Sequence, residues 1–402
     1  PYAIMLNGSD ASAAKDVKVA YCESIALTIP GYTGTGTPAF VWLSGTTAIN
    51  GSESWSSWEA GAPTEPGKYY IGYQFENAEG DTISLLDGSC SFTITKAVLA
   101  RPTGAHWQGG STACWSSVTK TLGGANAAVS GYKVTMYKGG EVTGKYDVTG
   151  AGTTSLDLAG VMTGNGKGLY TFTVQAVSAD ETHYTTSDAS AKSAVTAVVL
   201  VSVAAGEGVA SVTPASPQLL IAGNSARNSV AVTAALKSGR TFSGWSAGAA
   251  DAVTFGEQSA LETIATLKDG CTVTELTLTA ATSDTTAPTI SAYTAGTGDD
   301  YGKLTGTASD EGGHVAQYAF STASTVDGVT AGEWQTVGDN TAGAYATVEM
   351  QVTTAGKYYF YVKDSAGNSA RSESYIQASE VDYSGFYQNG TADATHKDFV
   401  VG

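Results

Sequence analysis

The feature that most constrains the fold is an alternation of apolar and polar side chains with a period of two residues. In residues 170–176, tyrosine, phenylalanine, valine and alanine alternate with threonine and glutamine, and residues 23–29, 230–236 and 347–352 follow the same pattern. A period of two places successive side chains on opposite faces of a β-strand. Charged residues, which usually cover helix surfaces, make up only 14% of the chain. We therefore predict an all-β protein built from antiparallel strands.

A glycine-tyrosine segment recurs along the chain. Residues 66–73 read Pro-Gly-Lys-Tyr-Tyr-Ile-Gly-Tyr, residues 355–362 read Ala-Gly-Lys-Tyr-Tyr-Phe-Tyr-Val, and residues 166–174 form a looser third copy. A turn followed by tyrosine and alternating apolar residues is typical of the late strand of an immunoglobulin-type sandwich. There the tyrosine packs at a corner, and we expect its hydroxyl to reach the backbone. The copies lie about one and two sandwich lengths apart, at roughly 100 residues per sandwich, so they mark separate modules.

The repeats and the strand-like segments between them predict four tandem β-sandwich-like modules. The linkers are only a few residues long, which favours an extended, semi-rigid rod over a flexible string. The predicted modules are residues 1–97, 98–199, 200–283 and 284–378, followed by a tail or the start of a further segment over 379–402.

Each predicted module carries short motifs of its own. They are Tyr21–Ile25 and Phe92–Lys96 in module one, Pro102–Trp107, Ala113–Trp115 and Gly131–Val134 in module two, Gly206–Gly208, Val230–Ala234 and Gly239–Trp245 in module three, and Asp284–Ile290 and Lys363–Asn368 in module four. On these motifs, modules one and four resemble the bacterial Ig-like modules of Gram-positive surface proteins. Module two resembles a fibronectin type III-like module, and module three resembles a divergent internalin-type B-repeat. The resemblance implies a secreted or surface-anchored bacterial protein, but it implies no common ligand and no activity.

The charge balance excludes some classes of partner. The chain has 37 acidic and 20 basic side chains, a net charge of −17. Phosphate binding requires clustered Lys and Arg, so we expect no nucleic-acid partner. No run approaches the ~18 apolar residues of a membrane-spanning helix, so we expect no membrane span. The chain opens at Pro1 without a signal peptide, and we interpret it as a processed or excised piece.

Motifs with catalytic chemistry are missing from the sequence. It contains no Gly-x-Ser-x-Gly elbow, no phosphate-binding loop and no His-Glu-x-x-His. Asp310 and Glu311 are adjacent carboxylates on a predicted turn, and we expect them to point apart. The histidines lack the ligand spacing of a zinc site, and we predict a protein that is not an enzyme and needs no cofactor. These histidines are His106, His183, His314 and His396.

Aromatic side chains are the candidate contacts for a protein or glycan ligand. Trp55 and Trp58 are three residues apart and cannot both point inward from one strand, so Trp55 is a candidate binding residue. Tyr359 and Tyr361 share one strand face and form either a contact patch or a packing surface between sheets or modules. The candidates in the tail are Tyr383, Phe386 and Tyr387. The tryptophans that we assign to the core are Trp42, Trp107, Trp115, Trp245 and Trp334.

Acidic side chains near the predicted turns are candidates for a structural calcium ion. Asp284 and Asp364 are the leading candidates, with Asp299, Asp300 and Asn368 as further donors. Calcium needs about six or more oxygen ligands, and no Asp-x-Asp-x-Asp run supplies them. Solvated turn residues are the alternative interpretation of these acids.

Two of the four cysteines fall in the same predicted module. A disulfide between Cys22 and Cys90 would close a long loop and stabilise the module by up to ~4 kcal/mol. It requires Cα atoms within about 7 Å, which depends on a strand pairing that the sequence leaves open. A disulfide and two free thiols therefore remain alternatives, while Cys114 and Cys271 stand alone in their modules.

Taken together, these features favour a non-enzymatic extracellular protein that is either displayed on a bacterial surface or secreted. The leading interpretation is adhesion or display, with the modules carrying a surface that binds a host glycoprotein, an immunoglobulin or a glycan. One alternative is a self-associating subunit of a fibre or surface layer, a homo-oligomer joined through its apolar start or its tail by strand addition to an open sheet edge. Another alternative is an accessory region of a larger carbohydrate-active enzyme.

Overall fold

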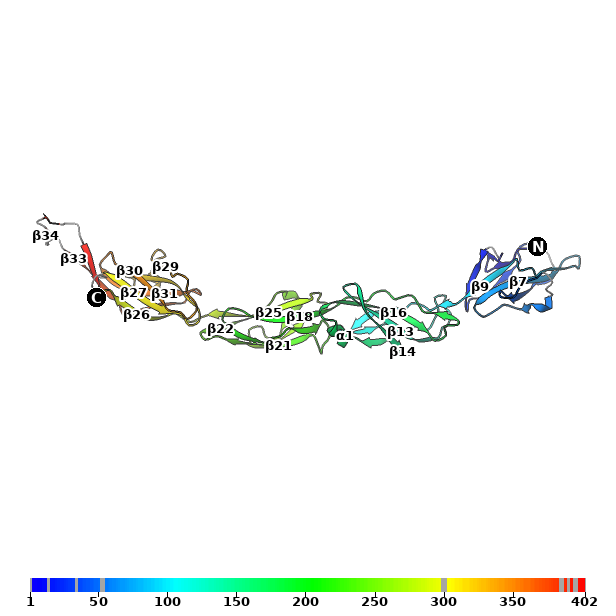
Figure 1. Cartoon of the computed structure of the whole chain (residues 1–402), viewed down its shortest axis with the longest axis horizontal. Coiled ribbons are helices and arrows are strands. Elements are labelled where there is room, and N and C mark those ends of the chain that lie inside the picture. Colours follow the sequence, from blue (N-terminus) through cyan, green and yellow to red (C-terminus); the bar gives the residue numbers. More distant parts are fainter. Residues whose placement is uncertain are drawn as a thin grey trace. The chain divides into compact units, whose positions relative to one another are not determined.

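Nearly all regular structure in the chain is β-strand, as the period of two predicts (Figure 1). In the part of the chain that the structure describes, the one α-helix is α1 (Ala159–Gly164), and no helix is long and apolar enough to cross a membrane. The chain divides into unit 1, Pro1–Val198 with Ile221–Ser225, and unit 2, Val199–Leu220 with Ala226–Gly402. The structure, a computed structural model, describes residues 2–12, 15–32, 35–50, 55–297, 302–382, 387–388, 391–392 and 397–401.

The N-terminal sandwich of unit 1 packs two sheets around an aromatic core. One sheet has the order β3-β9-β7-β5-β6 with β8 paired to β7, and the other has the order β2-β1-β4. Ile4, Leu6 and Tyr73 are fully buried in this core, so the apolar start of the chain folds into its own sandwich. The elements are β1 (Met5–Leu6), β2 (Ser9–Asp10), β3 (Val17–Ala20), β4 (Leu27–Thr28), β5 (Ala39–Ser44), η2 (Trp55–Ser57), β6 (Glu59–Ala60), β7 (Gly67–Glu76), β8 (Thr82–Leu85) and β9 (Ser91–Thr95).

The remainder of unit 1 is built on a sheet in which β14, β13, β16 and the start of β18 are neighbours. A second sheet has the order β11-β12-β15, and β10 pairs with β17. The alternating side chains Tyr170, Phe172, Val174 and Ala176 are all fully buried, as predicted. The strands are β10 (Ala97–Val98), β11 (His106–Gln108), β12 (Thr112–Cys114), β13 (Val129–Lys138), β14 (Glu141–Thr149), β15 (Ser155–Asp157), β16 (Gly168–Ser178), β17 (Tyr184–Thr185) and β18 (Thr196–Ala205).

The first sheets of unit 2 surround Trp245, which is 1% exposed and donates its indole N–H to the carbonyl of Ala260 at 3.0 Å. The end of β18 pairs with β25, which pairs with β22, and a second sheet has the order β19-β21-β24-β23. The predicted strand at 230–236 is present as β21. The elements are β19 (Val209–Thr213), β20 (Gln218–Ile221), β21 (Ser229–Leu236), β22 (Arg240–Ala247), η3 (Ala250–Ala252), β23 (Val253–Phe255), β24 (Glu262–Leu267) and β25 (Glu275–Asp284).

The last sandwich of unit 2 packs the sheet β26-β27-β30 against the sheet β29-β28-β31-β33-β36, with β32 paired to β31. Phe360 is fully buried in its core. The described part of the tail pairs β36 with β33 of the same chain. The elements are β26 (Thr289–Ala295), β27 (Lys303–Ser309), β28 (Val315–Ser321), η5 (Val326–Gly328), β29 (Gln335–Thr336), β30 (Ala346–Gln351), β31 (Gly356–Asp364), β32 (Ser369–Arg371), β33 (Ile376–Asp382), β34 (Tyr387–Gln388), β35 (Thr391–Ala392) and β36 (Lys397–Val401).

The tyrosines of the repeated segment form hydrogen-bonded corners, as the sequence predicts. In each copy the hydroxyl donates to the backbone carbonyl four residues earlier, at 2.7 Å for Tyr69, 2.6 Å for Tyr170 and 3.1 Å for Tyr358. A buried hydroxyl needs such a partner, and a carbonyl in the preceding turn supplies it locally. The chain is therefore all-β, with its sheets forming tandem β-sandwich domains.

Two details of the predicted strands are wrong. The strand expected over residues 23–29 is reduced to β4, because the Asn7 side chain bonds the carbonyl of Ser24 and the N–H of Ala26, at 2.9 and 2.8 Å. Those backbone groups are thus satisfied without a partner strand. The strands are also not all antiparallel, since β3 pairs with β9, β10 with β17 and β18 with β25 in parallel.

Candidate metal centre

Three aspartate side chains converge within unit 2. Asp284, Asp310 and Asp364, here called the aspartate cluster, each offer a carboxylate oxygen, and these oxygens all lie within 4.8 Å of one another. The three residues are only 8%, 1% and 4% exposed, respectively. Aspartate is almost never fully buried unless it is paired, so this arrangement requires a physical explanation.

The cluster forms because each aspartate stands at the end of a strand. Asp284 closes β25, Asp364 closes β31, and Asp310 directly follows β27. Local turns then orient two of the carboxylates. Asp284 accepts the N–H of Thr286 at 3.0 Å, and Asp364 accepts the backbone N–H and the side-chain amide of Asn368, both at 2.8 Å. Such bonds from a following turn are typical of aspartate at a strand end.

A pair of glycines lets the loop after Asp310 approach the carboxylates. A Cβ atom on Gly313 would lie 2.7 Å from Oδ2 of Asp310 and 2.8 Å from Oδ2 of Asp284, and one on Gly312 would lie 2.8 Å from Oδ1 of Asp284. These distances are shorter than van der Waals contact, so any larger residue would displace the carboxylates. The absence of a Cβ atom therefore lets the loop backbone pack directly against the carboxylate oxygens.

Three oxygens of the aspartate cluster lack a hydrogen-bond partner among the described residues. They are both carboxylate oxygens of Asp310 and Oδ2 of Asp284. An ionised carboxylate that is buried without a partner is strongly disfavoured. Burial raises the pKa of Asp310, and the charges of Asp284 and Asp364 raise it further, while the backbone N–H groups of Gly312 and Gly313 oppose this shift. Electrostatically, the site favours a positive charge next to Asp310.

Arg240 is the basic side chain that the structure places at the cluster. It stands at the start of β22, its side chain is 9% exposed, and its Nη2 lies 3.8 Å from Oδ2 of Asp284. The same Nη2 donates to the exposed carboxylate of Glu207 at 3.3 Å, and Nε donates to the carbonyl of Gly312. The guanidinium thus contacts the edge of the cluster but makes no hydrogen bond with its carboxylates.

Sequence reasoning found part of this site. It named Asp284, Asp364 and Asn368, and the structure brings them together: the Asn368 amide also donates to the carbonyl of Asp284 at 3.1 Å. Asp310 was not among the predicted calcium ligands, yet it is the most buried member of the cluster. The Gly-Gly pair after this acid was the available signal. Arg240 was missed, and Asp299 and Asp300 lie outside the described residues.

The aromatic candidates lie in different environments. Trp55 is half-buried in η2, whereas Trp58 is 6% exposed. Tyr359 is half-buried beneath Arg371, whose guanidinium carbon lies 4.7 Å from the ring centroid. Tyr361 does not belong to a contact patch, because it is fully buried and its hydroxyl donates to the carbonyl of Ala323 at 2.7 Å. Its ring fills a small second core, so packing is the correct alternative for this residue.

The tail candidates are largely outside the structural description. Tyr383 and Phe386 lie outside the described residues, as does His396. Tyr387 belongs to β34 and is opposite Ala392 of β35.

The disulfide considered between Cys22 and Cys90 is not formed, and both cysteines are free. The parallel pairing of β3 with β9 sets Ala20 opposite Thr95. Continuing this register places Cys22 level with residue 97, seven positions beyond Cys90, or about 23 Å at ~3.3 Å per residue. A disulfide needs Cα atoms within about 7 Å. Cys22 is exposed in a turn, and Cys90 is buried, so burial raises the pKa of the Cys90 thiol.

Unit 1 contains a second group of ionisable side chains, around His183. Its Nδ1 lies 2.5 Å from Asp180 Oδ2, and its Nε2 lies 2.5 Å from Glu65 Oε2. The ring of Tyr21 lies against the imidazole, with 4.5 Å between centroids. The hydrogen bond to Asp180, followed by that to Glu65, raises the pKa of His183.

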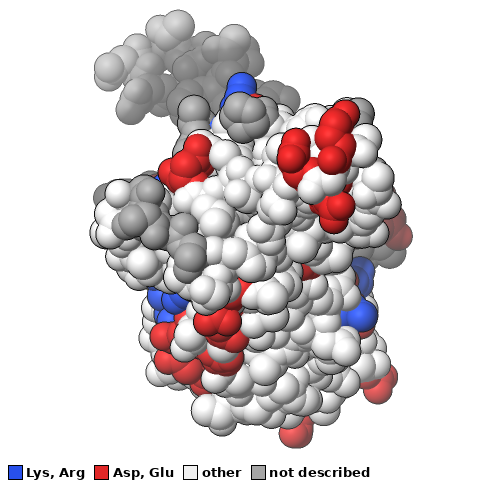
Figure 2. Space-filling view, turned by 90° about the vertical axis from the view of Figure 1, so that its right-hand side faces the viewer, with Lys and Arg blue, Asp and Glu red and all other residues white. Residues whose placement is uncertain are grey.

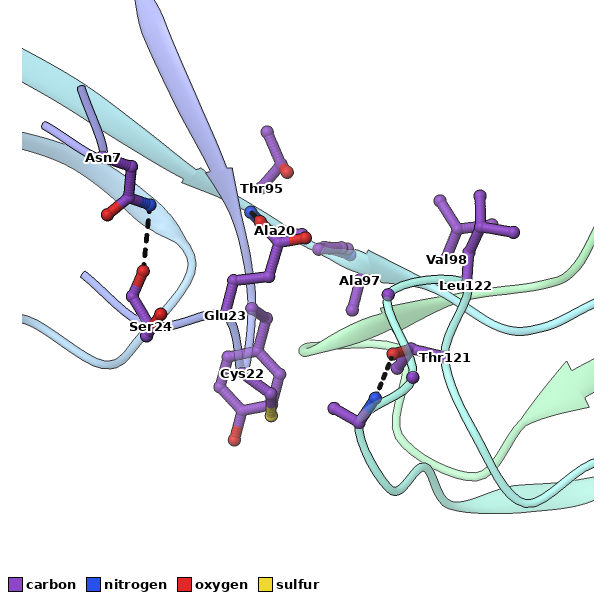
Figure 3. Close-up of a pocket in the computed structure, with 15 residues that line it drawn as sticks. Asn7, Ala20, Cys22, Glu23, Ser24, Thr95, Ala97, Val98, Thr121 and Leu122 are labelled. Carbon is purple, nitrogen blue, oxygen red and sulfur yellow. Dashed lines mark hydrogen bonds between the residues drawn. The ribbon is translucent and has the colours of Figure 1, made fainter. Parts of the chain in front are cut away.

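An open hollow of about 760 Å³ lies nearby in unit 1, lined by polar and apolar residues that include Cys22, Glu23 and Leu122 (Figure 3). Its walls are tied by short-range bonds, such as that from Asn7 to the carbonyl of Ser24. Among the described residues, only the aspartate cluster brings three potential metal ligands together. We therefore treat the aspartate cluster as the candidate site.

Comparison with known proteins finds matches among solved structures only. No protein-family model and no curated protein sequence matches the chain. Among solved structures, it is similar to the chicken CNTN1 FN1–FN3 domains, with 12% identity, 86% of this chain and 92% of that chain covered, and a TM-score of 0.19. It is similar to a tetra-tandem repeat in the extending region of a large adhesion protein, with 15% identity, 88% of this chain and 96% of that chain covered, and a TM-score of 0.24. It is also similar to Drosophila OTK extracellular domains 3–5, with 12% identity, 69% of this chain and 96% of that chain covered, and a TM-score of 0.15.

Proposed function

We propose that this chain is a non-enzymatic extracellular display segment of a bacterial surface or secreted protein, which presents a binding surface to a protein or glycan. The observation that carries the proposal is the recurrence of one structural solution along the chain. Tyr69, Tyr170 and Tyr358 form the same hydrogen-bonded corner in three separate β-sheets. Repeated sandwiches of this kind act as spacers when function resides in sites on their surface.

The surface chemistry supports an extracellular role. The net charge is −17, and the face in Figure 2 shows several groups of acidic side chains and few basic ones. An excess of one charge keeps a protein soluble, and it disfavours polyanionic partners. In the described part of the chain, no catalytic domain is evident: every sheet belongs to a β-sandwich or to a short strand pair.

A candidate contact surface lies on β31 and the segment that follows β32. Tyr375 is 43% exposed, and its ring is 5.9 Å from that of Tyr359. Lys357 lies over the Tyr375 ring at 4.6 Å, and Arg371 lies over the Tyr359 ring at 4.7 Å. Aromatic rings held by neighbouring cations are rigid contacts of the kind enriched in binding interfaces. We assign the ligand contact to this tyrosine pair.

The test is binding of the full chain to a glycan array and to immobilised immunoglobulin and host glycoproteins. We expect one of these to bind, and Tyr375→Ala to weaken that binding at least tenfold. Tyr345→Ala is the matched control, because Tyr345 is 71% exposed and stands apart from the tyrosine pair in the sequence. Equal binding by both variants would contradict the assigned surface, and no binding at all would contradict the display function.

The alternative function, a self-associating fibre subunit, has weaker structural support. Ile4 and Leu6 are buried in their own sandwich, and β36 pairs with β33 of its own chain. Strand addition to a neighbour would require these segments to leave their sheets. The remaining alternative, an accessory region of a carbohydrate-active enzyme, predicts a catalytic domain elsewhere in the parent protein, and the reading frame of its gene tests this.

A further inference from the structure

We propose that the aspartate cluster binds one Ca²⁺ ion, which links the ends of β25 and β31 and the turn after β27. The inference rests on the geometry of Asp284, Asp310 and Asp364, and it holds whether or not the chain is a display protein. It assigns a metal ion to a group of buried charges that the protein alone leaves unbalanced.

The charge balance of the site calls for a divalent cation. Three buried carboxylates face one guanidinium, that of Arg240, which leaves a net formal charge of −2. Glu207, which also contacts Arg240, is 81% exposed at its side chain and is balanced by solvent. Buried charges are normally paired or coordinate metals. One Ca²⁺ ion would neutralise the cluster.

The spacing of the oxygens suits calcium. Ca²⁺ binds oxygen at 2.3–2.6 Å, so ligands on opposite sides of the ion are about 4.6–5.2 Å apart. The cluster oxygens lie within 4.8 Å of one another and fit this span. Mg²⁺ demands a near-ideal octahedron at 2.0–2.1 Å and loses its water ligands reluctantly, so a buried group of three carboxylates suits Ca²⁺ better.

The unpartnered oxygens show that Arg240 does not neutralise the aspartate cluster. Its Nη2 is 3.8 Å from Asp284 and bonds Glu207, while its Nε bonds the carbonyl of Gly312. The carboxylate oxygens of Asp310, the most buried acid, have no hydrogen-bond partner of good geometry among the described residues, and the nearby N–H groups of Gly312 and Gly313 offset only part of the effect of burial. Both oxygens of Asp310 and Oδ2 of Asp284 are therefore available as ligands, and the Gly312–Gly313 backbone, which carries no Cβ atom, approaches them closely.

Direct binding is measured by isothermal titration calorimetry of the chelator-treated full chain with CaCl₂, in parallel with MgCl₂. We expect one Ca²⁺ site per chain and binding of Mg²⁺ that is at least tenfold weaker. Thermal unfolding should rise by about 5–10 °C at Ca²⁺ concentrations ~100-fold above Kd, and EDTA should reverse this rise.

Two variants with matched controls locate the site. Asp310→Asn keeps the shape of the side chain and removes its charge, and we expect it to abolish the Ca²⁺-dependent rise in melting temperature. Its control is Asp327→Asn, at an exposed acid in η5. Gly313→Ala keeps all three carboxylates but forces a Cβ atom against Oδ2 of Asp310 and of Asp284, and we expect it to weaken the calcium response. Gly338→Ala, where a Cβ atom meets nothing within 4 Å, is its control.

The variants also separate loss of the site from loss of the fold. Without calcium, Asp310→Asn should melt at or above the temperature of the unaltered chain, because an unpartnered buried charge has been removed. The proposal is overturned if the unaltered chain binds no Ca²⁺ at millimolar concentration, or if Asp310→Asn and Gly313→Ala retain the full calcium response. Equal affinity for Mg²⁺ would overturn the assignment to calcium.

Discussion

At the scale of single residues, tyrosine corners and the aspartate cluster show two ways of burying a polar group. The hydroxyl of Tyr170 reaches the carbonyl of Gly166 in the turn before its strand and that of Met162 in α1, and burial raises the pKa of Tyr170 to about 12 while the hydroxyl stays bonded. The carboxylate of Asp310 has no such partner among the described residues. The first arrangement stabilises the fold by itself, and the second makes it depend on a ligand.

Removing one corner hydroxyl should destabilise unit 1. Tyr170→Phe deletes bonds of 2.6 Å to Gly166 and 3.1 Å to Met162, and leaves both carbonyls with one partner fewer. We expect a loss of about 1–3 kcal/mol in the free energy of unfolding. Calorimetry of the full chain, which separates domain transitions, checks this value. Tyr345→Phe, at an exposed ring, should change nothing, and an equal effect there would contradict the role of the corner.

His183 should make the stability of unit 1 depend on pH. Asp180 and Glu65 raise its pKa in the folded state above ~6.5, its usual value. Its stabilising effect is therefore complete below pH ~6.5 and is lost as the pH rises through the folded pKa. We expect a higher melting temperature at pH 6 than at pH 8.5 for this transition. His183→Gln should flatten the profile, and an NMR titration of the imidazole showing an ordinary pKa would contradict the prediction.

At the scale of elements, the segment 187–193 pairs with the edge of β16 through every third residue, whereas a strand would pair through every second. Ser187, Ser190 and Ser193 follow β16, and each hydroxyl accepts a backbone N–H of that strand, at 2.8, 3.0 and 3.1 Å. Their own N–H groups donate to the carbonyls of the same strand residues. The serines thus replace the partner strand that the edge of β16 would otherwise need.

Loss of one of these serine hydroxyls should be costly. Ser190→Ala leaves the buried N–H of Val174 without its acceptor, since Ser190 is 7% exposed and excludes water. We expect the free energy of unfolding of unit 1 to fall by about 1–3 kcal/mol, measured by calorimetry. Ser117→Ala, at an exposed serine in the same unit, is the control. A change no larger than that of the control would show that the segment does not stabilise β16.

At the scale of the whole molecule, the termini belong to the sandwiches of their own chain. The apolar start contributes Ile4 and Leu6 to one core, and β36 covers β33 along residues 378–382. A covered edge is unavailable for pairing with another copy. This arrangement favours a single chain over a fibre.

Light scattering after size-exclusion chromatography tests this conclusion. We expect the full chain to be a monomer, and a chain ending at Asp382, which retains β33 and lacks β36, to associate more readily through the edge left open. The reverse result, with oligomers of the full chain that disappear on truncation, would favour the fibre subunit.

Local physics determined much of this protein from its sequence alone. The period of two at 170–176 predicted the buried face of β16, and the glycine-tyrosine repeats predicted the corners at Tyr69, Tyr170 and Tyr358. These features depend on neighbouring residues in the chain, so they can be read from it. Residues 23–29 show the limit, because the Asn7 side chain, distant in sequence, replaces a strand partner there.

Only the tertiary structure decided which distant groups meet. The parallel register of β3 and β9 separated Cys22 from Cys90, and packing converted Tyr361 from a candidate contact into core. Asp310 was not predicted as a ligand, because nothing near it in sequence reveals Asp284 or Asp364. Strand pairing and burial bring the three carboxylates together from the ends of three strands. Because the local dielectric is low, their mutual repulsion is strong, and a bound cation would relieve it.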